Sequence, residues 1–408
     1  MIAVHAAFFT FPLHGHVNPT LGVVAELVRR GHRVTFATTP EFADAVKAAG
    51  AEPLLYDNVM PKSLDLVIKP PGEVSSEEFH RSIRTITEEG FAPLAQAHDA
   101  LADDHPDVVL HDLTAFHTGR LLALKWGVPA IRLCTTIAFT DEFNPYLRFL
   151  GQHPDIDPTH PAITGEREAV VQALESHGVD LTPEEFRADT STLRRSLVFL
   201  PRELQVGADH FDDDFAFVGP CLTDRAFEDD WKPRQGTDPL VVVAFGTFGY
   251  TSQRRLFTEC VREFADRPWR VVLVVGNQVD PADLEPLPAN VEVRRWVPQL
   301  ALLAETDVFV SHAGMGSVTE ALWTGTPVVL LPQLTEQDLV AEQVTGLGLG
   351  RVVPRDNLGA KPVGEAVAEL LAALQDGDLP ARLTTMREAM RTAGGARRAV
   401  DVIEDVIA

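Results

Sequence analysis

The sequence predicts an α/β protein built from two doubly wound domains. Short apolar strands alternate with amphipathic helices along almost the whole chain, which is typical of this class. The alternation stops at residues 219–239, which are rich in Pro, Gly and Asp and have no periodicity, as expected of a linker. A length of 408 residues suits two domains. We therefore expect an N-terminal domain over residues 1–219, a linker over 220–239 and a C-terminal domain over 240–394.

The N-terminal half opens with three regular elements. They are a buried strand at residues 2–9, an amphipathic helix at 18–30 that Gly31 closes, and a second strand at 32–38. Further helices are expected at 41–48, over much of 77–102, and at 114–126, 167–176 and 183–188, and further strands at 107–110, 128–133, 196–200 and 215–218. Residues 141–192 are otherwise irregular, because Pro, His and polar residues interrupt the pattern.

The C-terminal half repeats the strand–helix alternation. Strands are expected at residues 240–245, 270–275, 291–295, 307–311 and 328–331. Residues 381–407 are expected to be helical, with an Ala-Gly-Gly interruption at 393–395. The two halves therefore share one architecture.

The composition excludes several classes of function. A net charge of −24 argues against binding to nucleic acids or anionic membranes, because both need basic patches. The three cysteines form no CxxC pair, which favours a reducing compartment. The chain begins with a strand-like apolar run rather than a signal peptide, and no apolar run reaches membrane-spanning length. We expect a cytoplasmic protein.

Residues 295–337 carry the most informative pattern in the chain. A Trp-x-Pro-Gln turn precedes an apolar strand, the Gly-rich turn HAGMGS and a helix that begins near Ser317. Such a turn lets the backbone approach an anion, and the helix start adds free N–H groups and a partial positive charge. The turn has neither the Lys-Ser/Thr of a P-loop nor the GxGxxG of a redox dinucleotide site. The pattern predicts a diphosphate cradle, with Trp296 upstream to stack on a flat base.

The same segment resembles the nucleotide-sugar signature of family-1 glycosyltransferases, W-x-P-Q, H-x-G-x-x-S-x-x-E, G-x-P and P-x-x-x-D-Q. The matching residues are Trp296, Pro298, Gln299, His312, Gly314, Ser317, Glu320, Gly325, Pro327, Pro332 and Gln337. HGHVNP, ELVRRGHRVTF and LHDLTAF, the last at residues 110–116, resemble the bacterial macrolide and polyketide glycosyltransferases most. The resemblance runs over essentially the whole chain. It implies the GT-B fold, in which two Rossmann-like domains face each other across a cleft and the last helix, here about 395–408, returns to the first domain.

Two histidines flank Gly15 after the first strand, and either is a natural general base for a hydroxyl nucleophile. Asp112 follows another strand of the same sheet, so it is expected at the same edge, where a carboxylate could fix the tautomer of His16. The resemblance places the base at His16 and the assisting aspartate at Asp112. His14 as the base, or a purely structural turn, remain alternatives.

The resemblance also assigns the donor site. Trp296 would stack on the base, with Val297 beside it, Gln299 would contact the base edge or ribose, and Glu320 would accept from the ribose hydroxyls. The diphosphate would be held by His312, Gly314, Gly316 and Ser317, with Gly246 and Thr247 adding donors from another strand end. The D-Q pair of the family, which contacts sugar hydroxyls, is Glu336–Gln337 in this chain. The extra methylene of Glu336 leaves the identity of the sugar open. For Trp296 and Glu320, core packing and a solvated helix face are the respective structural alternatives.

The acceptor site is the least determined part. Phe139, Phe143, Tyr146 and Phe149 could form an apolar wall for a hydrophobic acceptor, or could be ordinary packing residues. Asp212–Asp214 could suggest a metal site, but a solvated acidic turn is the better interpretation.

These features predict a metal-independent, inverting glycosyltransferase that needs no cofactor. The expected donor is UDP-glucose or, as an alternative, a dTDP-deoxysugar. The expected acceptor is a macrolide, another polyketide or a phenolic compound, and the role is antibiotic tailoring or inactivation. A nucleotide-sugar epimerase and a non-catalytic nucleotide-sugar-binding partner are the rival interpretations. The enzyme is expected to act as a monomer or homodimer.

Overall fold

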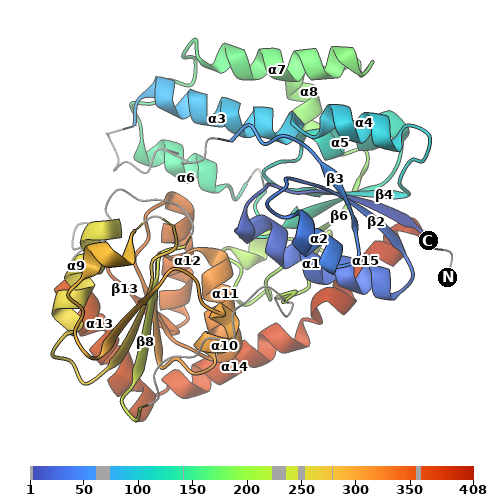
Figure 1. Ribbon diagram of the computed structural model, residues 1–408. Coiled ribbons are helices and arrows are strands. Elements are labelled where there is room, and N and C mark those ends of the chain that lie inside the picture. The colour runs from blue at the N-terminus through green and yellow to red at the C-terminus, as the bar shows by residue number, and fades with distance from the viewer. Residues whose placement is uncertain are drawn as a thin grey trace.

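The computed structural model describes residues 3–60, 74–140, 142–222, 236–246, 253–277, 279–354 and 360–408. Within these residues the chain forms two entirely parallel sheets, one in each half (Figure 1). The first has the strand order β3-β2-β1-β4-β5-β6-β7 and the second the order β10-β9-β8-β11-β12-β13. The α/β class and the doubly wound architecture are confirmed.

The strands of the N-terminal sheet are β1 (His5–Phe9), β2 (Arg33–Thr38), β3 (Glu52–Leu55), β4 (Val108–Asp112), β5 (Ala130–Cys134), β6 (Leu193–Val198) and β7 (Phe215–Phe217). Both β1 and β4 are buried along their whole length, because helices cover both faces of the sheet. The strand order reverses between β1 and β4, which pair in parallel. Ligands of open α/β sheets bind outside the carboxyl ends of strands at such a switch point.

Helix α1 (His14–Arg29) begins four residues earlier than the expected residue 18, so both histidines of the HGH sequence lie in its first turn. The helical structure expected over much of 77–102 is present as two helices, α3 (Ser76–Phe91) and α4 (Leu94–Leu101). Pro93 separates them, because proline cannot donate a backbone hydrogen bond inside a helix. The remaining helices of this half are α2 (Ala43–Ala48), α5 (His117–Trp126), α6 (Pro145–Gln152), α7 (Ile163–Ser176) and α8 (Pro183–Ala188).

The C-terminal sheet consists of β8 (Leu240–Ala244), β9 (Arg270–Val274), β10 (Val291–Arg294), β11 (Val308–Ser311), β12 (Val328–Leu330) and β13 (Gly350–Val352). Its helices are α9 (Gln253–Phe264), α10 (Gln299–Leu303), α11 (Met315–Thr324), α12 (Thr335–Gly346) and α13 (Ala360–Gln375). The central strand β8 is buried throughout, as expected of a sheet covered on both faces. The core of this half continues into the N-terminal half through Ile137, Leu204 and Phe211, so apolar packing joins the two halves.

Two further helices end the chain, α14 (Leu379–Thr392) and α15 (Gly395–Ile407). The break between them lies at Gly394, whose φ of 99° suits glycine. Helix α14 runs from the C-terminal half toward the N-terminal half, and α15 packs against α1 there (Figure 1). Arg30 fixes this contact, because its guanidinium donates to Asp401 at 2.8 Å and to Glu404 at 2.7 Å.

Candidate active site

His16 and Asp112 meet at the carboxyl edge of the N-terminal sheet. The Nδ1 atom of His16 lies 2.7 Å from an Asp112 carboxylate oxygen. The other carboxylate oxygen accepts from the backbone N–H of Thr114 at 2.7 Å, which fixes the carboxylate. A proton carried on Nδ1 is donated to Asp112, so Nε2 keeps a lone pair that can accept a proton.

The electrostatics of this pair favour a charged imidazolium beside a carboxylate. Burial opposes the charge on His16, but the Asp112 carboxylate outweighs it and raises the pKa of His16 above its ordinary 6.5. Burial likewise opposes ionisation of Asp112, yet His16 and the backbone N–H groups lower its pKa. The pair can therefore hold the proton that a base takes from a hydroxyl.

His14 has different surroundings, although it is only two residues away. Its ring makes an edge contact with Phe42 at a centroid distance of 4.9 Å, and its Nε2 lies 3.5 Å from a carboxylate oxygen of Glu41. Its ring centroid also lies 6.3 Å from that of Trp296 in the other half. The geometry therefore favours His16, which has the buried carboxylate, as the base.

The predicted nucleoside contacts come from the turn after β10 and from α10 and α11. Trp296 is 55% exposed, so the face of its indole is accessible rather than buried in the core. The side-chain amide of Gln299 donates to a carboxylate oxygen of Glu320 at 2.7 Å, and Glu320 is buried. The two residues predicted to contact base and ribose are thus held together from α10 and α11. Val297 is half-buried next to Trp296.

The turn between β11 and α11 is built tightly around His312. A Cβ atom added to Gly314 would lie 2.4 Å from Nε2 of His312, and one added to Gly246 would lie 2.7 Å from Cε1. Burial lowers the pKa of His312 to about 4, so its ring is neutral near pH 7. Ala313 adopts a φ of 66°, a strained value for a residue with a Cβ. This strain could not be predicted from the sequence, because alanine does not mark a position of positive φ.

Beyond this turn the start of α11 is open. Nothing lies within 4 Å of a Cβ atom placed on Gly316, and both Gly316 and Ser317 are accessible. The first N–H groups of a helix have no intrahelical partner and carry a partial positive charge, so they suit a diphosphate. Thr247, predicted to add a donor here, lies outside the described residues.

The predicted sugar-reading pair lies at the start of α12. Glu336 bonds to the Thr136 side chain of the N-terminal half and is close enough to His16 and Asp112 to interact with their charges. Burial raises the pKa of Glu336, the nearby His16 lowers it, and Asp112 raises it, with a net increase. Gln337 is buried, and its side-chain oxygen accepts from the backbone N–H of Gln333 at 2.7 Å.

The predicted acceptor residues fall into two groups. Phe143 stacks on His210 and packs against the core shared by the two halves, which is the packing alternative. Tyr146 and Phe149 lie on α6, where their rings contact Phe79 of α3 at centroid distances of 5.8 and 5.4 Å. Tyr146 is 43% exposed, so this aromatic group is accessible. Phe139 is half-buried.

Two residues of the candidate site were not predicted from the sequence. The Thr135 hydroxyl lies 3.2 Å from Nδ1 of His16, and Thr136 bonds to Glu336. Both follow β5, the strand next to β4, so their position at a strand end was the available signal.

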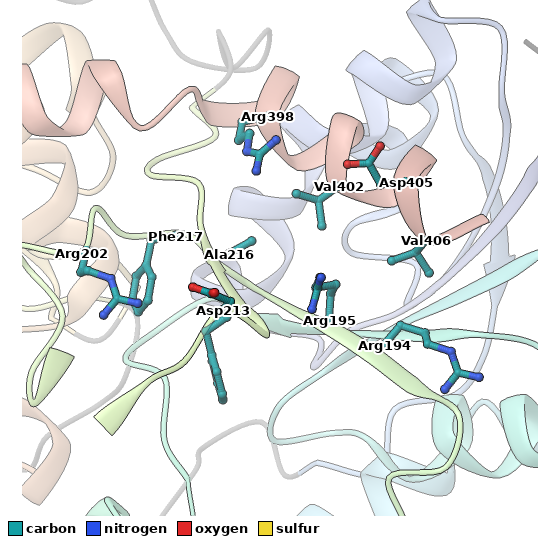
Figure 2. Close-up of a pocket in the computed structure, with 11 residues that line it drawn as sticks. Arg194, Arg195, Arg202, Asp213, Ala216, Phe217, Arg398, Val402, Asp405 and Val406 are labelled. Atoms are coloured by element: carbon teal, nitrogen blue, oxygen red, sulfur yellow. The ribbon is translucent and has the colours of Figure 1, made fainter. Parts of the chain in front are cut away.

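A separate groove of about 740 Å³ runs between the edge strand β7 and α15 (Figure 2). Apolar residues and six charged residues line this groove. The charged residues are Arg194, Arg195, Arg202, Arg398, Asp213 and Asp405. It contains none of the predicted site residues. In the described part of the chain no group of three or more His, Cys, Asp or Glu side chains could hold a metal ion. No helix among those residues is long and apolar enough to span a membrane.

Comparisons with known proteins agree with this geometry. Residues 262–403 match the family described as "Erythromycin biosynthesis protein CIII-like, C-terminal domain". The oleandomycin glycosyltransferase of Streptomyces antibioticus is 39% identical over 403 residues, which are 98% of this chain and 90% of that protein. The NDP-glycosyltransferase YjiC of Bacillus subtilis (strain 168) is 35% identical over 405 residues, covering 98% of this chain and 96% of YjiC.

The crystal structure of CalG4, the calicheamicin glycosyltransferase, has a TM-score of 0.82 and 36% identity. The comparison covers 100% of this chain and 99% of CalG4. The predicted resemblance is confirmed, and so is the predicted fold. The chain belongs to the family-1 glycosyltransferases, in the group that contains macrolide and other antibiotic glycosyltransferases, and its fold is GT-B.

Proposed function

We propose that this enzyme transfers a hexose from a nucleotide sugar to a hydroxyl of a hydrophobic natural product and inverts the anomeric configuration. A macrolide or another polyketide is the expected acceptor. The observation that carries the proposal is the 2.7 Å contact between His16 and Asp112, which builds a general base at the switch point of the N-terminal sheet.

In the proposed reaction Nε2 of His16 takes the proton of the acceptor hydroxyl. The oxygen forms a bond to the anomeric carbon of an α-linked donor, and the bond from that carbon to the diphosphate oxygen breaks. The products are a β-glycoside and a free nucleoside diphosphate, which leaves with the bonding electron pair. Asp112 stabilises the imidazolium, and the start of α11 stabilises the charge on the leaving group.

UDP-glucose is the proposed donor, because an ionised Glu336 can accept hydrogen bonds from sugar hydroxyls. A dTDP-deoxysugar is the alternative, since the demethyllactenocin mycarosyltransferase of Streptomyces fradiae is also 35% identical, over 99% of this chain. We propose that no metal or cofactor is required, because the start of α11 supplies positive potential at the diphosphate and the neutral ring of His312 can donate an N–H hydrogen bond to it. The three cysteines are buried and unpaired, which supports a reducing compartment.

The test is transfer from UDP-glucose, dTDP-glucose and a dTDP-deoxysugar to a panel of hydrophobic acceptors, followed by mass spectrometry. Oleandomycin is the first acceptor to try, because a relative with 39% identity is named for it. The proposal expects a product one hexose heavier than its acceptor, a β-linkage by NMR and undiminished turnover in EDTA.

Each alternative gives a different outcome in that experiment. An epimerase would change the donor sugar without any acceptor. A non-catalytic binding partner would bind the donor and transfer nothing. A strict requirement for Mg²⁺ or Mn²⁺ would contradict the metal-free mechanism.

A further inference from the structure

Helix α12 is held against the N-terminal half by a row of side chains. The Thr335 hydroxyl, at the first residue of α12, donates to the side-chain oxygen of Gln152 at 2.9 Å. Two turns further along, the Arg148 guanidinium forms a two-pronged ion pair with Glu342, with one N···O distance of 2.9 Å. The Gln343 amide donates to the backbone oxygen of Glu203 at 3.1 Å. All three contacts join the two halves of the molecule.

Two of these contacts come from α6, the helix that carries Tyr146 and Phe149. Arg148 and Gln152 are four residues apart, so they share one face of α6, which meets α12. The aromatic pair meets Phe79 of α3. No residue of α6 is fully buried, so its position depends on these two sets of contacts rather than on a core of its own.

The N-cap residue of α12 is Leu334, so the cap of this helix comes from elsewhere in its first turn. Leucine has no side-chain acceptor, and apolar residues are among the poorest N-caps. The side-chain oxygen of Gln337 accepts from the backbone N–H groups of Gln333 and Leu334, at 2.7 and 3.2 Å. Gln152 adds a hydrogen bond from the opposite domain to the same turn, at Thr335, one residue before Glu336.

We propose that Gln152, with Arg148, positions the sugar-reading turn of α12 from the acceptor side of the cleft. The inference rests on the proposed function, in which Glu336 and Gln337 face the donor sugar. An acceptor that packs on α6 then strengthens binding of the sugar, and the sugar strengthens binding of the acceptor by the same factor. Recognition of the nucleotide is unaffected, because Trp296 lies outside the α6–α12 contact.

The experiment compares the Kd of UDP-glucose with the Kd of UDP, by calorimetry on the full chain. Gln152→Ala and Thr335→Val each remove one partner of the hydrogen bond, and Thr335→Ser keeps the hydroxyl. Gln152→Ala and Thr335→Val are each expected to raise the Kd of UDP-glucose roughly 3–10-fold, the effect of one lost hydrogen bond, while the Kd of UDP changes by less than about 2-fold. Thr335→Ser should keep the wild-type ratio of the Kd of UDP-glucose to the Kd of UDP. The double variant Gln152→Ala/Thr335→Val should bind UDP-glucose no more weakly than either single variant.

Arg148→Ala should have the smaller effect, because Arg148 and Glu342 are partly exposed. Arg351→Ala is the matched control, since it breaks the Arg351–Glu369 ion pair, which lies within the C-terminal half and far along the chain from α6. It should leave both Kd values unchanged.

Equal weakening of UDP and UDP-glucose by Gln152→Ala, or an unchanged ratio, would overturn the positioning role and leave the proposed function standing. If the wild type binds a dTDP-sugar instead, the same ratio is measured with dTDP-glucose and dTDP. Failure of the wild type to bind any of these nucleotides would remove the proposed function and this inference with it.

Discussion

The proposed donor and acceptor sites are built in different ways. The proposed donor site consists of turns at strand ends, in which glycines and short side chains leave the backbone free to approach a ligand, as at Gly314 and Gly316. The proposed acceptor site consists of side chains on α3 and α6 that pack on one another and on the opposite domain. A turn that must cradle a diphosphate restricts its residues one by one. A wall that must only be apolar can be made from many different residues. The residues of a donor site are therefore easier to predict from sequence than those of an acceptor site.

The largest expected effect concerns the catalytic pair. Asp112→Asn keeps the size of the side chain but removes the charge that stabilises the His16 imidazolium. We expect kcat to fall roughly 10–10³-fold, below the 10²–10⁴-fold typical of losing a general base. Because the two residues act as a unit, the double variant with His16→Ala should be no slower than His16→Ala alone.

The pH dependence of the same variant sharpens the result. His16 accepts a proton only when neutral, so wild-type kcat should rise as pH increases through a pKa that Asp112 holds above 6.5. Removing the carboxylate lowers that pKa, and the rising limb of the pH–rate profile should move to lower pH. A limb that stays in place would show that Asp112 does not act on the titrating group.

The next effect tests base stacking on the donor side. Trp296→Ala should weaken UDP binding by about 1–3 kcal/mol, the range for bases stacked on aromatic residues in other proteins. Phe replacement should recover most of the loss, because it keeps an aromatic face. Titration calorimetry measures both variants, and an unchanged Kd for Trp296→Ala would exclude the indole as the stacking surface.

Glu336 tests whether the donor side selects the sugar. A buried acceptor left without its donor costs about 1–3 kcal/mol, so wild type should prefer UDP-glucose to a deoxysugar donor. Glu336→Ala should reduce that preference, chiefly by lowering kcat/KM for UDP-glucose. Because the pKa of Glu336 is raised, the ionised form and the preference should both decline as pH falls through that pKa. If kcat/KM shows the same donor ratio in both proteins, Glu336 does not read the sugar.

The smallest expected effect compares two glycines of the cradle. Gly314→Ala places a methyl group against the buried His312 and should destabilise the fold by about 1–3 kcal/mol. Gly316→Ala meets open space inside a helix and should leave stability equal or higher, while its methyl group hinders the diphosphate. Denaturant unfolding measures the stability effect and UDP titration the effect on binding. Wild-type UDP affinity in Gly316→Ala would show that the diphosphate does not bind at the start of α11.

The fold was largely predictable because its strands are continuous apolar runs between helices. The strand β3 was missed because its four residues include Pro53 and are half-exposed, so they lack that signal. Some predicted bounds were wrong: α1 and α7 each begin four residues earlier than expected, and α6 lies in a stretch that was expected to be irregular. The strand-end residues of the site were predictable from the turns that hold them.

Apart from the contact between His16 and Asp112, which two strand ends of one sheet bring together, contacts between distant segments were not predictable. Gln299 was assigned to the base edge or ribose and Glu320 to the ribose hydroxyls, and only the structure shows that the two side chains bond to each other. The contact of Gln152 with Thr335 joins residues 183 positions apart, and neither position stands out in the sequence. Such pairs depend on how the two domains meet, which no local pattern encodes.

The most direct test of the account measures kcat and donor Kd for His16→Ala, with an acceptor that carries an alkyl alcohol. In the proposed mechanism His16 and Asp112 perform the chemistry and the C-terminal half binds the donor, so kcat should fall roughly 10²–10⁴-fold while the Kd of UDP-glucose stays near wild type. Near-wild-type turnover, or a loss confined to donor binding, would contradict the assignment of His16 as the base.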